Sequence, residues 1–170
     1  GQGNKTIDYV TIATTGNSAT FGILTRGSGR AAATSNGKRA LFFGGYGVST
    51  TFSDSIDYFA MATLGNASVY GTITSGEAGY TAATGDGTYG MVGKGYNNGW
   101  GQNTWVDYCS IDTTGNTTLF GGAFVGWQQN TALMTSGAFA CSNGVRAFYG
   151  GGYQQENQFG NPDMWSSIEH

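Results

Sequence analysis

The chain alternates short apolar runs with turn-forming residues. Residues 39–46 are apolar on both faces, which predicts a strand covered on both sides. The dipeptide Asn36-Gly37 precedes this run and favours a two-residue hairpin turn with positive φ at both central positions. The small residues 31–35 before the turn predict the partner strand. No stretch of useful length has the 3.6-residue period of a helix, so the pattern predicts an all-β protein.

This pattern recurs along the whole chain. One phrase occupies residues 5–22 (KTIDYVTIATTGNSATFG), 54–71 (DSIDYFAMATLGNASVYG) and 104–121 (TWVDYCSIDTTGNTTLFG), and a second occupies residues 31–46, 81–96 and 138–153. The copies start near Ile7, Ile56 and Val106, and a fourth copy begins near Ile168. Periods near fifty residues are typical of propellers and solenoids, so we interpret residues 1–170 as one repeat array.

Each repeat contains four predicted strands. The hairpin around Asn36-Gly37 supplies two, residues 56–63 the third and residues 67–74 the fourth. Four strands joined as a meander are typical of a β-propeller blade. We expect the small-residue strands nearest the propeller axis, at residues 31–35, 81–85 and 138–142. We expect six repeat positions to be buried between blades: Phe21, Tyr70, Phe120, Phe42, Val92 and Tyr149.

The order of these features is similar to the kelch repeat. An apolar run and glycine pair (Phe42-Phe43-Gly44-Gly45) is followed by an aromatic strand (Ile56-Asp57-Tyr58) and an aromatic residue after a Gly-Asn turn (Tyr70). The chain departs from the kelch pattern in two ways. Phe or Tyr replaces the usual Trp of the fourth strand, and the second glycine pair is Lys94-Gly95. The phrases also resemble kelch-like repeats of bacteriophage tail and structural proteins over essentially all 170 residues.

The resemblance implies an all-β fold of three kelch-like propeller blades and a non-enzymatic role in a virion. Such a protein would serve as a tail, baseplate or fibre propeller in particle assembly or in host-surface attachment. Its partners would be other virion proteins, copies of itself, or a host glycan or protein, and its place the virion or the extracellular medium. The alternatives are a secreted carbohydrate-binding propeller and a kelch-type scaffold for protein partners.

Three blades cannot close a ring that typically has four to eight. One interpretation is that the chain is part of a longer propeller. Another is that it closes by self-association, for instance as two chains making six blades, and a third is an open monomer with two bare blade faces. Certain repeat positions are expected to be structural, the aspartates by bonding backbone N–H groups at a blade edge: Asp8, Asp57, Asp107, Phe21, Tyr70, Phe120, Gly45, Gly95 and Gly152.

The loops predict a binding surface on one side of the molecule. In a four-strand meander the tight Asn-Gly and Gly-Asn turns share one face, and the long connections share the other. The third copy is lengthened at residues 122–137 and 154–165, both on the long-connection face. Aromatic and amide side chains there suit sugars or a polar protein surface, with contacts insensitive to salt. The candidate binding residues are Trp100, Trp127, Gln128, Gln129, Tyr153 and Trp165.

Charge and residue chemistry argue against several other functions. Charged residues make up 10% of the chain, the net charge is −3 and no basic cluster occurs, which disfavours nucleic acid and anionic membranes. No apolar run approaches the length needed to cross a bilayer. The single histidine is His170, and no His, Cys and carboxylate cluster has metal-ligand spacing, so we expect no enzyme, metal or cofactor. Cys109 and Cys141 are interpreted as small buried thiols, with a disulfide left open.

Overall fold

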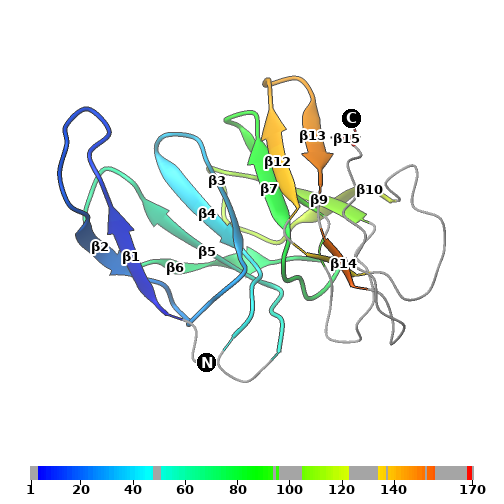
Figure 1. The fold of residues 1–170 in the computed structure, drawn as a ribbon, viewed down its shortest axis with the longest axis horizontal. Helices are drawn as coiled ribbons and strands as arrows, with labels where there is room; N and C mark the ends of the chain where they lie inside the picture. Colours follow the sequence, from blue (N-terminus) through cyan, green and yellow to red (C-terminus); the bar gives the residue numbers. More distant parts are fainter. Residues whose placement is uncertain are drawn as a thin grey trace.

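The computed structural model describes residues 4–47, 51–93, 95, 105–122, 134–136, 138–151, 153–155 and 168–169. Every regular element in these residues is a β-strand, and all strand pairs are antiparallel (Figure 1). The all-β prediction is therefore confirmed for this part of the chain.

Two complete four-stranded sheets form the centre of the molecule. The first has the order β3 (Ala32–Ser35), β4 (Arg39–Phe43), β5 (Ser55–Ala60) and β6 (Ser68–Thr72). The second has the order β7 (Ala82–Gly85), β8 (Tyr89–Gly93), β9 (Trp105–Ser110) and β10 (Thr118–Gly122). Spatial order equals chain order in both sheets, so each is the antiparallel meander that the repeats predict.

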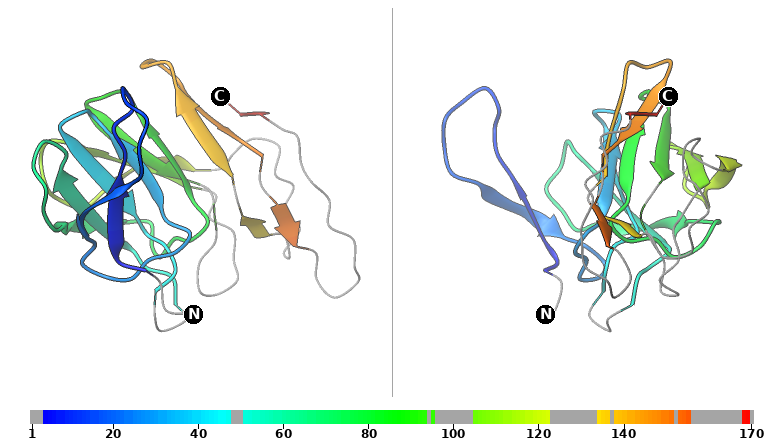
Figure 2. Two further views of the ribbon diagram at one scale, coloured as in Figure 1. Left: turned by 60° about the vertical axis from the view of Figure 1, so that its left-hand side comes forward. Right: turned by 45° about the vertical axis from the view of Figure 1, so that its right-hand side comes forward.

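The sheets at either end are incomplete. The hairpin of β1 (Thr6–Tyr9) and β2 (Ala19–Ile23) stands alone at one end, as Figure 2 shows. At the other end β12 (Phe139–Ser142), β13 (Ala147–Gly150) and β15 (Ile168–Glu169) form three strands. A separate pair joins β11 (Met134–Ser136) to β14 (Tyr153–Gln155). The described sheets form an open array, and they do not close into a ring.

The small-residue strands of successive repeats are neighbours. Strand β3 contacts β7, and β7 contacts β12, whereas the later strands of each sheet fan outward (Figure 1). Small side chains permit this close approach. An added Cβ at Gly90 of β8 would lie 2.9 Å from the Thr34 methyl group of β3, so glycine at that position also lets the two sheets pack closely.

The hydrophobic core lies between the two complete sheets. It contains apolar side chains from β4, β5, β8 and β9, including Leu41, Phe43, Ile56 and Val92, which are fully buried. Tyr70 of β6 also belongs to the core. Three residues of the connections complete it: Ile73, Ala78 and Ile111. Apolar residues on both faces of β4 are thus explained, because this strand is covered from two sides.

The hairpin turns differ from the predicted geometry. The backbone N–H of Asn36 donates to the Arg39 carbonyl (3.2 Å), so the two central residues of the turn are Gly37 and Lys38. Of these two, only Gly37 has positive φ. This resembles a type II′ turn, which needs positive φ only at the first central residue. The Asn36 side chain accepts the backbone N–H groups of Lys38 (3.0 Å) and Arg39 (2.8 Å). Because it serves as the acceptor, Asn36 keeps an ordinary backbone conformation.

The predicted burial of the six repeat aromatics and aliphatics is correct at three positions. Tyr70, Val92 and Tyr149 are buried. Phe21 and Phe42 are half-buried. The β1–β2 sheet, which carries Phe21, has only two strands. The prediction is wrong for Phe120, which is 68% exposed. Phe21 packs on Phe59 of the next sheet at 4.7 Å between ring centroids, whereas Phe120 packs on Tyr108 of its own sheet at 6.0 Å.

Candidate functional site

The recurring aspartates join one sheet to the next. The carboxylate of Asp107 in β9 is fully buried and accepts the backbone N–H (3.1 Å) and hydroxyl (2.5 Å) of Ser75 and the hydroxyl of Thr117 (2.6 Å). Asp57 of β5 accepts the backbone N–H of Thr25 (3.0 Å) and its hydroxyl (2.7 Å). Thr25 and Ser75 follow the fourth strand of the preceding sheet, so these carboxylates hold neighbouring sheets together.

The Gly-Asn turns dock on the aromatic-glycine pairs. Gly65 N–H donates to the Phe21 carbonyl (3.1 Å), and the Asn66 side chain accepts Ile23 N–H (3.2 Å). An added Cβ at Gly22 would lie 2.0 Å from the Gly65 carbonyl oxygen, so only glycine permits the contact. The next repeat has the same arrangement, with Gly115 on the Tyr70 carbonyl (3.1 Å) and Gly71 as the glycine beneath. The phrase that recurs three times therefore encodes an interface between sheets.

Glycine at the ends of the second strands serves a different contact. Gly45 has φ 101° and donates its N–H to the Ala78 carbonyl (2.8 Å), and an added Cβ would lie 2.0 Å from the Ser28 hydroxyl. Gly95 has φ 98°, and its added Cβ would lie 2.3 Å from the Gly79 carbonyl. Both residues have left-handed backbone and lie very close to atoms of a neighbouring connection, and these two conditions explain why glycine recurs at this repeat position. Gly152 lies outside the described residues.

Of the six predicted binding residues, Tyr153 lies in the described part of the chain. Trp100, Trp127, Gln128, Gln129 and Trp165 lie outside the described residues. The backbone of Tyr153 pairs with Ser136 between β14 and β11.

The two faces of the molecule follow the predicted division. Tight turns contact one another on one face, where the Asn36 side chain donates to the Asp112 carboxylate (2.9 Å). The long connections lie on the opposite face, where isolated β-bridges join the β4–β5 connection to those before β3 and β7, at Gly29 with Tyr46 and at Ser53 with Ala78. Figure 1 shows the β3–β4, β7–β8 and β12–β13 turns at the top and the connections at residues 24–31 and 44–47 toward the bottom.

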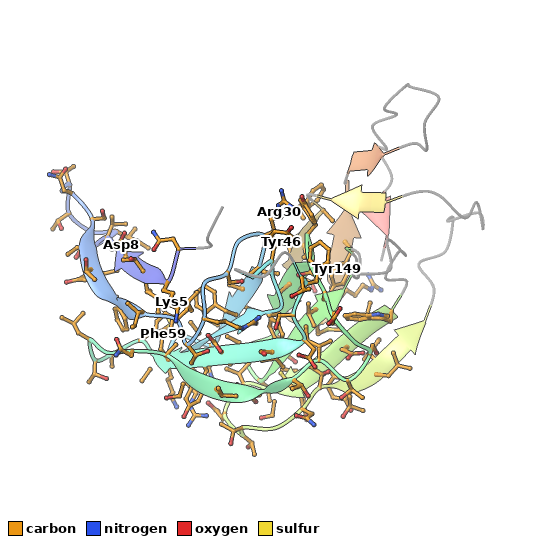
Figure 3. All side chains as sticks on the ribbon, turned by 90° about the horizontal axis from the view of Figure 1, so that it is seen from below. Lys5, Asp8, Arg30, Tyr46, Phe59 and Tyr149 are labelled. Atoms are coloured by element: carbon orange, nitrogen blue, oxygen red, sulfur yellow. The ribbon has the colours of Figure 1, made fainter. Side chains whose placement is uncertain are left out.

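An arginine and three aromatic residues cluster on the connection face. The Arg30 guanidinium lies 4.2 Å from the Tyr80 ring centroid and 5.2 Å from that of Tyr46. Phe52 is buried, and its ring centroid lies 5.2 Å from that of Tyr46 and 6.2 Å from that of Tyr80. Figure 3, which views the molecule from below, shows Arg30 and Tyr46 side by side near its middle. We call these four residues the Arg30 cluster.

The Arg30 cluster has strained backbone at two equivalent repeat positions. Arg30 and Tyr80 each lie two residues before the first residue of a first strand, β3 or β7, and they have φ of 60° and 58°. The Tyr80 N–H donates to the Arg30 carbonyl (3.0 Å), which ties the two positions together. Left-handed backbone at residues other than glycine and asparagine costs free energy and is common at binding sites. The sequence contains no signal for positive φ at Arg30 and Tyr80, because the backbone angles there depend on the contacts that each connection makes.

The electrostatics of the cluster favour a ligand with an acceptor group. Arg30 is exposed, and within the described residues no carboxylate forms an ion pair with it. Its neighbour Arg26 is instead used internally, donating through Nη2 to the carbonyls of Gly44 (3.0 Å) and Ser55 (2.7 Å). Burial lowers the pKa of Arg26, against the opposing effect of Asp57 and Asp54. Arg26 therefore supports the connections, while Arg30 is an exposed residue whose guanidinium lies against the two tyrosine rings.

Other candidate chemistry is sparse in the described parts of the chain. No three His, Cys, Asp or Glu side chains of the described residues lie close enough to hold a metal ion. A hollow beside the β5–β6 turn is lined by residues that supply no acid, base or thiol: Tyr58, Phe59, Ala60, Thr63, Leu64, Gly65, Asn66 and Ser68. Cys109 is buried as predicted, but Cys141 is exposed, because it lies on the outward face of β12, and both thiols are free. Among the described residues we find no helix with the length and apolar character of a membrane span.

Comparison with known proteins identifies the fold alone. No protein-family model matches the sequence, and no curated protein matches it. The chain is similar to the solved structure of YjhT, with a TM-score of 0.62 at 12% sequence identity. The match covers 81% of this chain and 47% of the YjhT chain, so the chain spans about half the length of that structure. At this identity the likeness shows a shared fold.

Proposed function

We propose that this protein is a non-enzymatic binding module, built as a segment of a kelch-like β-propeller, that contacts its partner through the connection face. The observation that carries the proposal is the exposed Arg30 guanidinium held against the rings of Tyr46 and Tyr80. The rigid sheets beneath keep the connections in place, which is how binding surfaces are commonly built.

The cluster suits a partner that offers a carboxylate or several hydroxyl and carbonyl oxygens. Stacking on two tyrosine rings orients the planar guanidinium and leaves N–H groups for a ligand. The half-buried tyrosine rings provide apolar area beside these donors, a combination common in glycan and protein contacts. Binding through Arg30 should weaken with salt, whereas binding through Trp127 and Trp165 of the inserted segments should not.

The biological setting that we propose is the virion. The resemblance of the repeats to phage tail and structural proteins supports it, and the low charge and dense β-structure are compatible with a particle exposed to the medium. A tail, baseplate or fibre protein would use the connection face for host-surface attachment or for contact with other virion proteins. A secreted carbohydrate-binding propeller is the second candidate, favoured by the aromatic rings beside polar donors.

The test compares arginines on opposite faces. Arg30→Ala removes the proposed contact, and Arg146→Ala removes an exposed arginine of the tight-turn face. Each variant is measured for binding to host cells, for binding to a glycan array and for incorporation into particles. A loss of one activity in Arg30→Ala alone supports the proposal and identifies the partner class. If Arg30→Ala and the Trp127→Ala/Trp165→Ala double variant retain all three, while Arg146→Ala loses one, the wrong face has been chosen.

A further inference from the structure

The two ends of the array carry complementary halves of the interface that joins neighbouring sheets. Within the chain, a Gly-Asn turn and an aspartate of one sheet meet an aromatic-glycine pair of the preceding sheet, at β5–β6 on β2 and at β9–β10 on β6. In the β1–β2 hairpin the aspartate is Asp8 and the turn is Gly16-Asn17. Strand β10 has the aromatic-glycine pair at Phe120-Gly121.

Among the described residues, neither Asp8 nor Phe120 has a partner from a neighbouring sheet. Asp8 is exposed, as Figure 3 shows at the outer end of the molecule, whereas the equivalent Asp57 and Asp107 are buried. Phe120 is 68% exposed, and an added Cβ at Gly121 meets nothing within 4 Å. Gly22 and Gly71 are the positions equivalent to Gly121 inside the array, and there the added Cβ would lie 2.0 and 2.1 Å from the carbonyl oxygen of a docked turn. The contrast is confined to the ends of the array.

The β13 edge has the register that an incoming β1 strand requires. In the complete sheets Phe43 lies opposite Ile56 and Phe42 opposite Asp57, and Gly93 lies opposite Val106. At β13, Gly150 lies opposite Ile168 and Tyr149 opposite Glu169 of the two-residue strand β15. A β1 strand in that place would set Ile7 opposite Gly150 and Asp8 opposite Tyr149. It would also bring its own fourth strand, β2, which β15 lacks.

We propose that a second copy of this chain covers these faces, with its β1–β2 hairpin replacing the two-residue strand β15 beside β13 and completing a four-stranded sheet. In that sheet Asp8 and the Gly16-Asn17 turn of one copy dock on β10 of the other. The exposed apolar side chains Tyr9, Val10 and Phe120 then pack across the new contact, as Phe59 and Phe21 do within the chain. Each copy gives one hairpin and receives one, so two copies form two identical contacts and close a ring of six sheets.

A second copy fits better than an unrelated partner for a specific reason. The two halves belong to one repeating interface, whose hydrogen bonds, glycine contacts and aspartate positions are seen twice in this molecule. A partner must present an Asp, a Gly-Asn turn and two further strands in the same register, and the chain itself carries all of them. The inference is independent of what the connection face binds.

The first experiment measures the mass of the 170-residue chain in solution by light scattering and sedimentation. The expected mass is twice the 17.7 kDa of one chain. Gly121→Ala places a methyl group where the Gly16 carbonyl of the other copy would sit, and should weaken self-association by about 100-fold or more. The control, Gly29→Ala, also meets nothing within 4 Å and should leave the mass unchanged. Thermal unfolding of both variants at low concentration verifies that each remains folded.

The second experiment tests the head-to-tail arrangement in a Cys141→Ser background, because Cys141 is exposed. A Val10→Cys chain is mixed with a Phe120→Cys chain under mild oxidation. The proposal predicts a disulfide-linked pair in the mixture and little linkage in either chain alone. A monomer at all concentrations overturns the proposal. So does an assembly that persists in Gly121→Ala and links Val10→Cys or Phe120→Cys to itself.

Discussion

Three aspartates at one repeat position provide a graded test of the contacts between sheets. Asp107 accepts hydrogen bonds from three donors on Ser75 and Thr117. Asp57 accepts from two donors, both on Thr25. Asp8 is exposed and has no such donor among the described residues. Replacement by alanine removes the same atoms in each case, so the loss of unfolding free energy should follow the order Asp107, Asp57, Asp8.

The magnitudes follow from burial. Asp107 is fully buried, Thr117 is buried and Ser75 is half-buried, so Asp107→Ala leaves donors that water reaches poorly, and we expect a loss of roughly 3–5 kcal/mol. Thr25 is exposed and water can replace the carboxylate, so Asp57→Ala should cost roughly 2 kcal/mol. Asp8→Ala should change the unfolding free energy by less than about 0.5 kcal/mol in the monomer. Asp107→Asn keeps the shape and one acceptor and should fall between Asp107→Ala and the unchanged protein.

The assay is urea unfolding followed by tryptophan fluorescence and far-UV circular dichroism, with the protein dilute enough to be monomeric. Repeat arrays can unfold in steps, so the two probes must coincide and the m-value must stay constant before free energies are compared. A loss below about 1 kcal/mol for Asp107→Ala would refute the inference that this carboxylate joins the sheets. Equal losses at Asp107 and Asp8 would refute it as well, since only one of them has partners.

Further predictions concern the interface and the thiols. Gly71→Ala should cost more than about 4 kcal/mol in urea unfolding, because its methyl group would lie 2.1 Å from the Gly115 carbonyl; a stable variant would contradict the docked turn. Tyr70→Phe should cost roughly 1–2 kcal/mol in the same assay, since the Tyr70 hydroxyl donates to the carbonyls of Ser110 and Thr113. A thiol reagent at pH 8 should modify Cys141 and spare Cys109 until the protein unfolds, and Cys141→Ser should abolish the reaction. Burial raises the pKa of Cys109 from about 9 to about 11, so its stabilising contribution should be present below pH 9 and lost as the pH rises toward 11; Cys109→Ala should flatten the fall in melting temperature across that range.

The predictions from the sequence succeeded where structure depends on local contacts. The strands β3 to β6 lie within a few residues of their predicted bounds, because apolar runs and turn residues act over short distances. The turn at Gly37 was found, but its type was wrong, since the Asn36 side chain caps the turn and spares its own backbone. The repeat period identified equivalent positions correctly, but it could not say whether each had a neighbour. Phe120 and Asp8 therefore look like Tyr70 and Asp107 in the sequence, although they are exposed.

The sequence by itself determined the strand order, the division into tight and long connections and the repeating aspartate and glycine positions, because these depend on residue type and spacing. Only the tertiary structure decided which of these positions form contacts between sheets, because the partners lie 32 residues apart for Asp57 with Thr25 and for Asp107 with Ser75. The Arg30 cluster also required the fold. Its members come from three separate connections, and the left-handed backbone at Arg30 and Tyr80 is imposed by the packing of those connections.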